Sequence, residues 1–227
     1  PTDRHEARAS SPDISMTIAG RPYCSTSLDA QIPAIPACIS SEAIISQWLT
    51  DGGSSRNFAI YHKEDGSIEA IQSRSTGNHN VSTSKSLVND RWYHVVVTRD
   101  NSGNSMKIYI DGVLHQEKSD HTANTLDDAD RSFKIGGFDS ARPLNANISD
   151  VAYYNSALTS SQVKTIYNGR EPYNHKEGVA SGNLQGWWRM GDGLENHSGS
   201  TIYDMSVNSN NGTMTNMASD DFTGDTP

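Results

Sequence analysis

The carboxylates of this sequence do not show the spacing that a retaining glycosidase needs. That chemistry requires two carboxylates about 5 to 5.5 Å apart. Glu64 and Asp65 fall together at an expected hairpin turn, and Asp127 and Asp128 fall in an expected loop. The sequence also lacks a Gly-x-Ser-x-Gly nucleophile elbow, and its eight histidines show no metal-ligand spacing. We therefore expect no catalytic residues and no enzymatic activity.

Oxygen ligands that suit a calcium ion come close together in the segment 136–150. Asp139 lies in a loop that follows two glycines, and Asn145 and Asp150 follow within a few residues. Carboxylate and amide oxygens are the side-chain ligands that calcium prefers. The alternative is that Asp139 and Asn145 cap turns and that Asp150 bonds to the backbone. Calcium is thus the cofactor to test, and the capping interpretation stays open beside it.

Aromatic side chains that reach the surface could stack on the faces of sugar rings. Trp187 and Trp188 are adjacent, and neighbouring side chains on a strand point to opposite sides. One of the two must therefore leave the core or meet a covering element. Three tyrosines in expected strands are further candidates for ligand contact: Tyr61, Tyr109 and Tyr153.

The elements that would position these residues are mostly strands. Asp65-Gly66 and Asp111-Gly112 each separate two strand-like runs, and this dipeptide favours the two positive φ angles of a type I′ hairpin turn. Between the hairpins, the segment 91–98 is rich in β-branched and aromatic residues, as a buried strand is. We expect Trp92 of this run to lie in the core.

One helix interrupts the strands. Thr159 and Gln162 have the spacing of a capping box, in which each side chain bonds to the backbone of the other residue. Apolar residues follow at helical spacing as far as Tyr167, and Gly169 supplies a stop signal. We expect a short surface helix that packs on a sheet.

Composition and charge exclude several classes of protein. Of 227 residues, 34% are hydrophobic, 20% are charged and 18 are glycine, which favours an all-β fold with many loops over a helical bundle. No apolar run approaches the roughly 20 residues of a membrane span. The net charge of -9, without a basic stripe, excludes nucleic acid as a partner. Cys24 and Cys38 could be bridged or free.

Three motifs together resemble a known family. They are 91–98, 106–112 with its Tyr-Ile-Asp-Gly, and 147–159, which leads into the helix. In this order they resemble laminin G-like domains of the concanavalin A-like lectin/glucanase superfamily, of the kind found in marine bacterial surface proteins and phage structural proteins. The resemblance implies an antiparallel jelly-roll β-sandwich. Two elements that usually open such domains resemble 186–193 and 203–213, which lie near the other end of this chain.

The resemblance divides the chain into a leader, a sandwich, a linker, a C-terminal group of strands and a tail. The strands either complete the sandwich or begin a second module. The expected ranges, in the same order, are 1–13, 14–169, 170–183, 184–217 and 218–227.

The function implied by the resemblance is recognition without catalysis, outside a cell or on a virion surface. The expected partner is a glycan or a protein on a cell or particle surface, with no nucleic acid and no membrane insertion. A homo-oligomer and tandem modules are both open. A structural module for capsid decoration or assembly is one alternative, and a divergent glycosidase or polysaccharide lyase is another.

Overall fold

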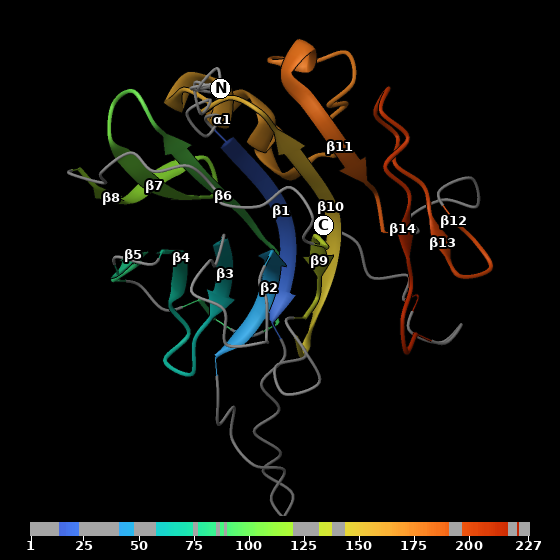
Figure 1. Ribbon diagram of the computed structural model, residues 1–227, viewed down its shortest axis with the longest axis horizontal. Coiled ribbons are helices and arrows are strands. Elements are labelled where there is room, and N and C mark those ends of the chain that lie inside the picture. Colours follow the sequence, from blue (N-terminus) through green and yellow to red (C-terminus); the bar gives the residue numbers. More distant parts are fainter. Residues whose placement is uncertain are drawn as a thin grey trace, which may run out of the picture.

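The computed structural model describes residues 14–22, 41–47, 58–74, 77–84, 87–88, 90–119, 132–137, 144–190, 197–217 and 222. Within these residues the chain forms two larger antiparallel sheets, one over the other, and a small third sheet beside them (Figure 1). One short α-helix accompanies them, so the expected all-β sandwich is confirmed. Several residues discussed above lie outside the described part: Cys24, Cys38, Asp127, Asp128 and Asp139.

The first sheet has six strands in the order β11-β10-β1-β6-β7-β8. Their bounds, in that order, are Leu184–Trp188, Ala146–Tyr154, Ile14–Pro22, Tyr93–Asp100, Ser105–Ile110 and Val113–Lys118. The second sheet has five strands in the order β5-β4-β3-β2-β9. Their bounds are Gly77–Ser82, Ile68–Arg74, Phe58–His62, Glu42–Gln47 and Lys134–Ile135. The third sheet joins β12 (His197–Ser198), β13 (Thr201–Ile202) and β14 (Gly212–Thr213).

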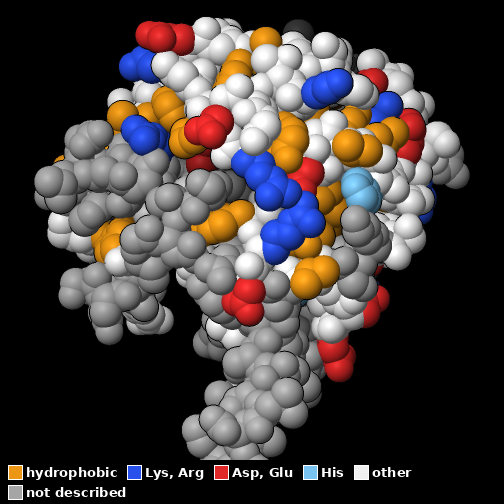
Figure 2. All heavy atoms as spheres, turned by 180° about the vertical axis from the view of Figure 1, so that it is seen from behind, with side chains coloured by type: hydrophobic (Ala, Val, Ile, Leu, Met, Phe, Trp, Pro, Cys, Tyr) orange, Lys and Arg blue, Asp and Glu red, His pale blue; other side chains and the backbone are white. Residues whose placement is uncertain are grey.

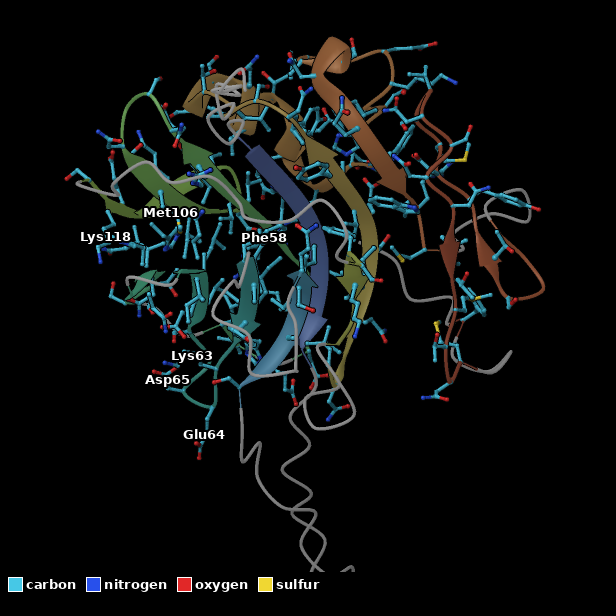
Figure 3. All side chains as sticks on the ribbon, in the orientation of Figure 1. Phe58, Lys63, Glu64, Asp65, Met106 and Lys118 are labelled. Atoms are coloured by element: carbon cyan, nitrogen blue, oxygen red, sulfur yellow. The ribbon has the colours of Figure 1, made fainter. Side chains whose placement is uncertain are left out.

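The main core lies between the two larger sheets. Phe58 of β3 and Met106 of β7 both point into this space, whereas Lys63, Glu64 and Asp65 project from the loop after β3 (Figure 3). Strand alternation explains the pattern, because Tyr93 and Val95 face inward. A second apolar cluster, which includes Val96, Ala152 and Trp187, lies on the opposite face of the six-stranded sheet.

The two Asp-Gly turns differ. At Asp111-Gly112 both residues have positive φ, 50° and 74°, so the expected type I′ turn is confirmed. At Asp65-Gly66 the prediction of a type I′ turn is wrong. Of these two residues, Gly66 alone has a positive φ, at 80°. The Asp65 carboxylate accepts a hydrogen bond from Ser67 N at 2.9 Å, and Lys63 N donates to the Ser67 carbonyl, which together make a wider loop.

Helix α1 (Ser160–Tyr167) begins with the expected capping box. Gln162 N donates to the Thr159 hydroxyl at 3.3 Å, and Thr159 N donates to the Gln162 side chain at 2.8 Å. Its buried residues, Val163 and Ile166, pack on the outer face of the six-stranded sheet. The helix ends at Tyr167, and Asn168 and the expected stop residue Gly169 follow with positive φ angles of 48° and 66°.

The C-terminal strands lie against the sandwich. β11 pairs with β10, so residues 184–188 form an edge strand of the six-stranded sheet. Ile202 of β13 belongs to the main core, and Met214 packs against it. The division of the whole chain into domains stays a prediction.

The surface carries local concentrations of charge. Seen from behind, Lys and Arg side chains gather near the middle of the molecule, with acidic and hydrophobic side chains beside them (Figure 2). Positive charge is therefore concentrated locally on a chain whose net charge is -9. In the part of the chain that the structure describes, no helix is long and apolar enough to cross a membrane.

Candidate ligand-binding pocket

A pocket of about 440 Å³ lies beside the end of α1 and β11, where the outer face of the six-stranded sheet meets the segment after the helix. Its lining combines aromatic rings with charged groups. The rings belong to Trp92, Tyr93, His94, Tyr167, Tyr173, His175 and Trp187. The charged groups belong to Asp111, Asp150, Arg170, Glu171 and Arg189. Apolar surface with a few polar groups is the composition of sites that bind small molecules.

Asp150 enters the pocket from an irregularity in β10. The pairing of β10 with β1 shifts between Thr17 and Ala19, and Asp150 has a φ of 56° in an otherwise extended strand. Bulges of this kind redirect a side chain. The Asp150 carboxylate accepts a hydrogen bond from Trp187 Nε1 through Oδ1, at 2.5 Å, and its Oδ2 lies 3.5 Å from His175 Nε2.

His175 connects this carboxylate to the core. Its side chain is almost fully buried, and its Nδ1 lies 2.6 Å from the Tyr154 hydroxyl. With the proton on Nε2, facing Asp150, the Tyr154 hydroxyl donates to Nδ1. Burial raises the pKa of Tyr154, and Tyr173 and Asp150 raise it further, so this hydroxyl keeps its proton. The network fixes the Trp187 ring, which His175 contacts edge-on at 5.4 Å between centroids.

Asp111 holds the opposite side of the pocket together. Its Oδ2 lies 2.8 Å from Arg91 Nη2 and 3.5 Å from Arg170 Nη2, and its Oδ1 accepts from His94 N at 3.1 Å. Arg170 Nε donates to the Tyr167 hydroxyl at 3.3 Å, and this bond raises the pKa of Arg170. One carboxylate thus connects the β7–β8 turn, the end of α1 and the start of β6.

Positive φ angles occur at three charged residues that line the pocket and at seven other non-glycine residues among those described. Asp111, Asp150 and Arg170 all have positive φ, at 50°, 56° and 82°. The turn accounts for Asp111, but the other two sit in a strand and directly after a helix. Left-handed residues other than glycine cost free energy and cluster where a side chain has to be aimed. The side chains of Asp111, Asp150 and Arg170 thus reach the pocket from a left-handed backbone conformation.

His94 lies on the outer face of β6 under Tyr167. The two rings stack, with centroids 5.8 Å apart and planes 28° apart. Within the described residues, both ring nitrogens of His94 are shielded from water and have no hydrogen-bond partner. Burial lowers the pKa of His94 to about 4 and repulsion from His175 adds to this, while Asp150 and Asp111 act in the opposite direction. The ring is therefore neutral at physiological pH.

A family model described as the concanavalin A-like lectin/glucanases superfamily matches residues 36–164, which is more than half of the chain. The chain belongs to this superfamily. A comparison with curated protein sequences gave no significant match.

Solved structures agree with a concanavalin A-like sandwich. A candidate carbohydrate binding protein from Bacteroides ovatus is 20% identical, with a TM-score of 0.64 over 91% of this chain and 53% of its own. The CBM40 module of the Ruminococcus gnavus IT-sialidase, bound to α2,3-sialyllactose, is 13% identical, with a TM-score of 0.52 over 70% of this chain and 84% of its own. At these identities the likeness shows the fold. The chain spans about half the length of the Bacteroides protein.

The residues that were expected to contact sugar lie in different parts of this concanavalin A-like sandwich. Trp187 and Trp188 face opposite sides, as strand alternation requires, and the segment that contains Tyr173 and His175 covers Trp187 at the pocket wall. Trp188 lies in the main core, where its ring stacks on Phe133 at 5.5 Å and its Nε1 donates to the Asn210 carbonyl at 2.9 Å.

The three candidate tyrosines lie away from this lining. Tyr61 and Tyr109 are 3% and 1% exposed, so they have almost no surface to offer a ligand. The Tyr109 hydroxyl lies 3.1 Å from the Ser160 hydroxyl at the start of α1. Tyr153 packs against the main core, and burial raises its pKa. Their role as ligand contacts stays a prediction.

The calcium candidates are spread along β10. Asn145 directly precedes the strand, where its backbone N donates to Glu42 Oε2 at 3.3 Å. Five Cα-to-Cα steps of strand, about 16 Å, lead from it to Asp150. Both Asp150 oxygens already have protein partners, in Trp187 and His175. Among the described residues, no group of three or more His, Cys, Asp or Glu side chains comes together. A site that uses Asp139 lies outside that part, and calcium stays a prediction.

Several residues that line the pocket were not predicted from the sequence. The segment 170–183 has no period and was expected to be a linker, yet Tyr173 and His175 of this segment form the pocket wall. Trp92, expected in the core, is half-buried and lines the pocket. Tyr173 and His175, two rings placed soon after the helix stop, were the one signal in the sequence.

Proposed function

We propose that the chain is a non-catalytic carbohydrate-recognition module and that the pocket holds a sugar unit. The observation that carries the proposal is a lining in which aromatic faces stand beside polar groups held in fixed positions. The half-buried ring of Tyr173 offers an apolar face for the C–H side of a sugar ring, and Trp187, which is 8% exposed, lines the wall beside it. The charged groups of Arg170 and Glu171, which also line the pocket, offer hydrogen bonds around them.

The names of the structural neighbours support this ligand class. The Bacteroides ovatus protein, whose fold covers 91% of this chain, is a candidate carbohydrate binding protein, and the Ruminococcus gnavus module was solved with a bound sialyllactose. Their names describe a candidate sugar-binding protein and a sugar-bound module, and both share the sandwich fold with this chain.

The buried network favours binding over catalysis. Tyr154 has no exposed surface, and the two oxygens of Asp150 face Trp187 and His175. A general acid or base must reach the bond that it breaks. In this arrangement the three groups position the Trp187 ring instead. An assay for released reducing sugar tests the alternative of a divergent glycosidase.

We extend the proposal to the place of action, which is outside a cell or on the surface of a virion, in adhesion or attachment. This step rests on the resemblance to surface proteins and phage structural proteins. Fractionation of the source cells or particles, followed by detection of the chain, tests it directly. A chain found in the cytoplasm contradicts it.

A glycan array tests the proposed ligand class. The wild-type chain is compared with Tyr173→Ala in the pocket and with Leu114→Ala, which removes an exposed side chain of β8 outside it. We expect the wild type and Leu114→Ala to bind the same glycans, and Tyr173→Ala to bind about tenfold more weakly. Melting curves establish that each variant is folded. Each screen is run with calcium and with a chelator, which tests the calcium prediction. A wild-type chain that binds no glycan contradicts the proposal and favours an assembly role.

A further inference from the structure

The imidazole of His94 is a polar group that the described fold leaves unsatisfied. Its Nδ1 and Nε2 are both shielded from water and have no hydrogen-bond partner among the described residues. A buried polar group without a partner costs free energy, and native structures keep few of them. Each one therefore needs a reason, and a ligand that supplies the missing partner is such a reason.

The location of His94 connects it to the pocket. It points outward from β6 and lines the pocket, and the ring of Tyr167 stacks over it. The charged and titratable groups that act on it come from three other elements: Asp111 from the β7–β8 turn, Asp150 from β10, and His175 from the segment after α1. None of these side chains makes a hydrogen bond to its ring.

We propose that His94 recognises a hydroxyl group of the bound sugar. The inference rests on the proposed function and names the chemistry of the contact. A neutral imidazole offers one donor and one acceptor, and a hydroxyl can serve either of them. A charged ligand group in the same place would lose its hydration without an opposite charge from His94. The group that reaches this ring is therefore uncharged.

Tyr167 covers the His94 ring in this structure. It is the last residue of α1, and its ring also rests on Gly112, where an added Cβ would lie 3.0 Å from Tyr167 Cδ1. A hydroxyl reaches His94 when the Tyr167 side chain rotates outward. The aromatic face of Tyr167 then stays beside the ligand instead of over the imidazole.

His94→Phe separates a binding role from a structural one. Phenylalanine keeps a flat ring that stacks on Tyr167 and removes both unsatisfied nitrogens. The variant should therefore melt at the same or a higher temperature than the wild type at pH 7. Its affinity for the sugar should fall about tenfold, the worth of one good hydrogen bond. The matched control is His62→Phe on β3, because His62 is also buried and its Nε2 also lacks a partner among the described residues.

The probes are the methyl glycosides of glucose, galactose, mannose and N-acetylglucosamine, followed by the monodeoxy derivatives of the tightest binder, measured by calorimetry. We expect one deoxy sugar to bind the wild type about tenfold more weakly than its parent, and His94→Phe to bind both equally. His62→Phe should bind like the wild type. Equal affinity of His94→Phe and the wild type for the parent sugar overturns the inference but leaves the proposed function standing. If no glycoside binds the wild type, the proposed function fails, and the inference fails with it.

One measurement does not depend on the folding of a variant. The ring signals of His94 in the wild-type chain are followed by nitrogen-15 NMR while the tightest-binding glycoside is added. A new hydrogen bond at Nδ1 or Nε2 changes the chemical shift of that nitrogen. Ring signals that stay constant at saturation, together with measured binding, overturn the inference.

Discussion

Trp187 Nε1 donates a hydrogen bond to Asp150 Oδ1 at 2.5 Å, across the pairing of β11 with β10. The bond joins an edge strand to a residue whose left-handed backbone turns its carboxylate toward the pocket. His175 Nε2 lies 3.5 Å from the other oxygen of the same carboxylate. The orientation of the aromatic wall therefore depends on a single carboxylate.

Replacing Asp150 should destabilise the chain and weaken sugar binding. Asp150→Ala leaves the Trp187 indole N–H without its acceptor, and we expect a loss of about 1 to 3 kcal/mol in the free energy of unfolding. Asp150→Asn should lose less, because asparagine tolerates positive φ and keeps an acceptor oxygen. Urea denaturation measures both variants. Equal stability of Asp150→Ala and the wild type would show that the bond contributes nothing.

Gly112 is required for its backbone conformation and for the space above it. Gly112→Ala places a side chain at a φ of 74° and 3.0 Å from the Tyr167 ring. Gly136→Ala is the control, since its φ is 76° but no atom of the described residues lies within 4 Å of an added Cβ. We expect the control to cost about 1 to 2 kcal/mol, and Gly112→Ala to cost more. Thermal melts that shift equally for the two variants would contradict the close contact.

The lowered pKa of His94 predicts a pH dependence of stability. The pKa is about 4 in the folded chain against 6.5 for an ordinary histidine. Between these values the unfolded chain binds the proton first, so stability is full above pH 6.5 and falls as the pH approaches 4. The full effect is on the order of 3 kcal/mol. The free energy of unfolding is measured at pH 7.5 and at pH 4.5. Between these two values it should fall more for the wild type than for His94→Phe. Parallel losses would show that His94 does not titrate in this way.

The Tyr154 hydroxyl should matter more than the Tyr109 hydroxyl. Tyr154→Phe leaves the Nδ1 of the buried His175 without a partner, at a cost of about 1 to 3 kcal/mol. Tyr109→Phe removes a contact to Ser160, which is exposed and can bond to water instead. We expect the second loss to be about 1 kcal/mol or less. Denaturant titration of the two variants checks the order, and a larger loss for Tyr109→Phe contradicts it.

Local signals predicted the parts of the fold that depend on nearby residues. The type I′ turn at Asp111-Gly112 requires two residues, and the capping box requires Thr159 and Gln162. Alternation placed Trp187 and Trp188 on opposite faces before any partner was known. The Asp65-Gly66 turn departed from its dipeptide because Ser67 offers the Asp65 carboxylate a competing bond.

The pocket depends on contacts between distant parts of the chain, which a pattern in the sequence cannot show. Asp150 lies in a run that resembles a regular strand, and nothing in that run indicates the irregular pairing with β1. His175 lies in a segment without periodicity, and its role arises because that segment returns over the six-stranded sheet. Both residues acquire their function from neighbours more than 20 positions away.

The indole N–H signals of the chain provide the most direct test of sugar binding in this pocket. Trp187 lines the pocket, while the adjacent Trp188 lies in the core and is bonded to Asn210, so the two signals are an internal comparison. Proton–nitrogen NMR spectra are recorded while the best glycan from the array is added. We expect the Trp187 signal to move in a saturable way and the Trp188 signal to stay constant. Binding that leaves the Trp187 signal in place would contradict it.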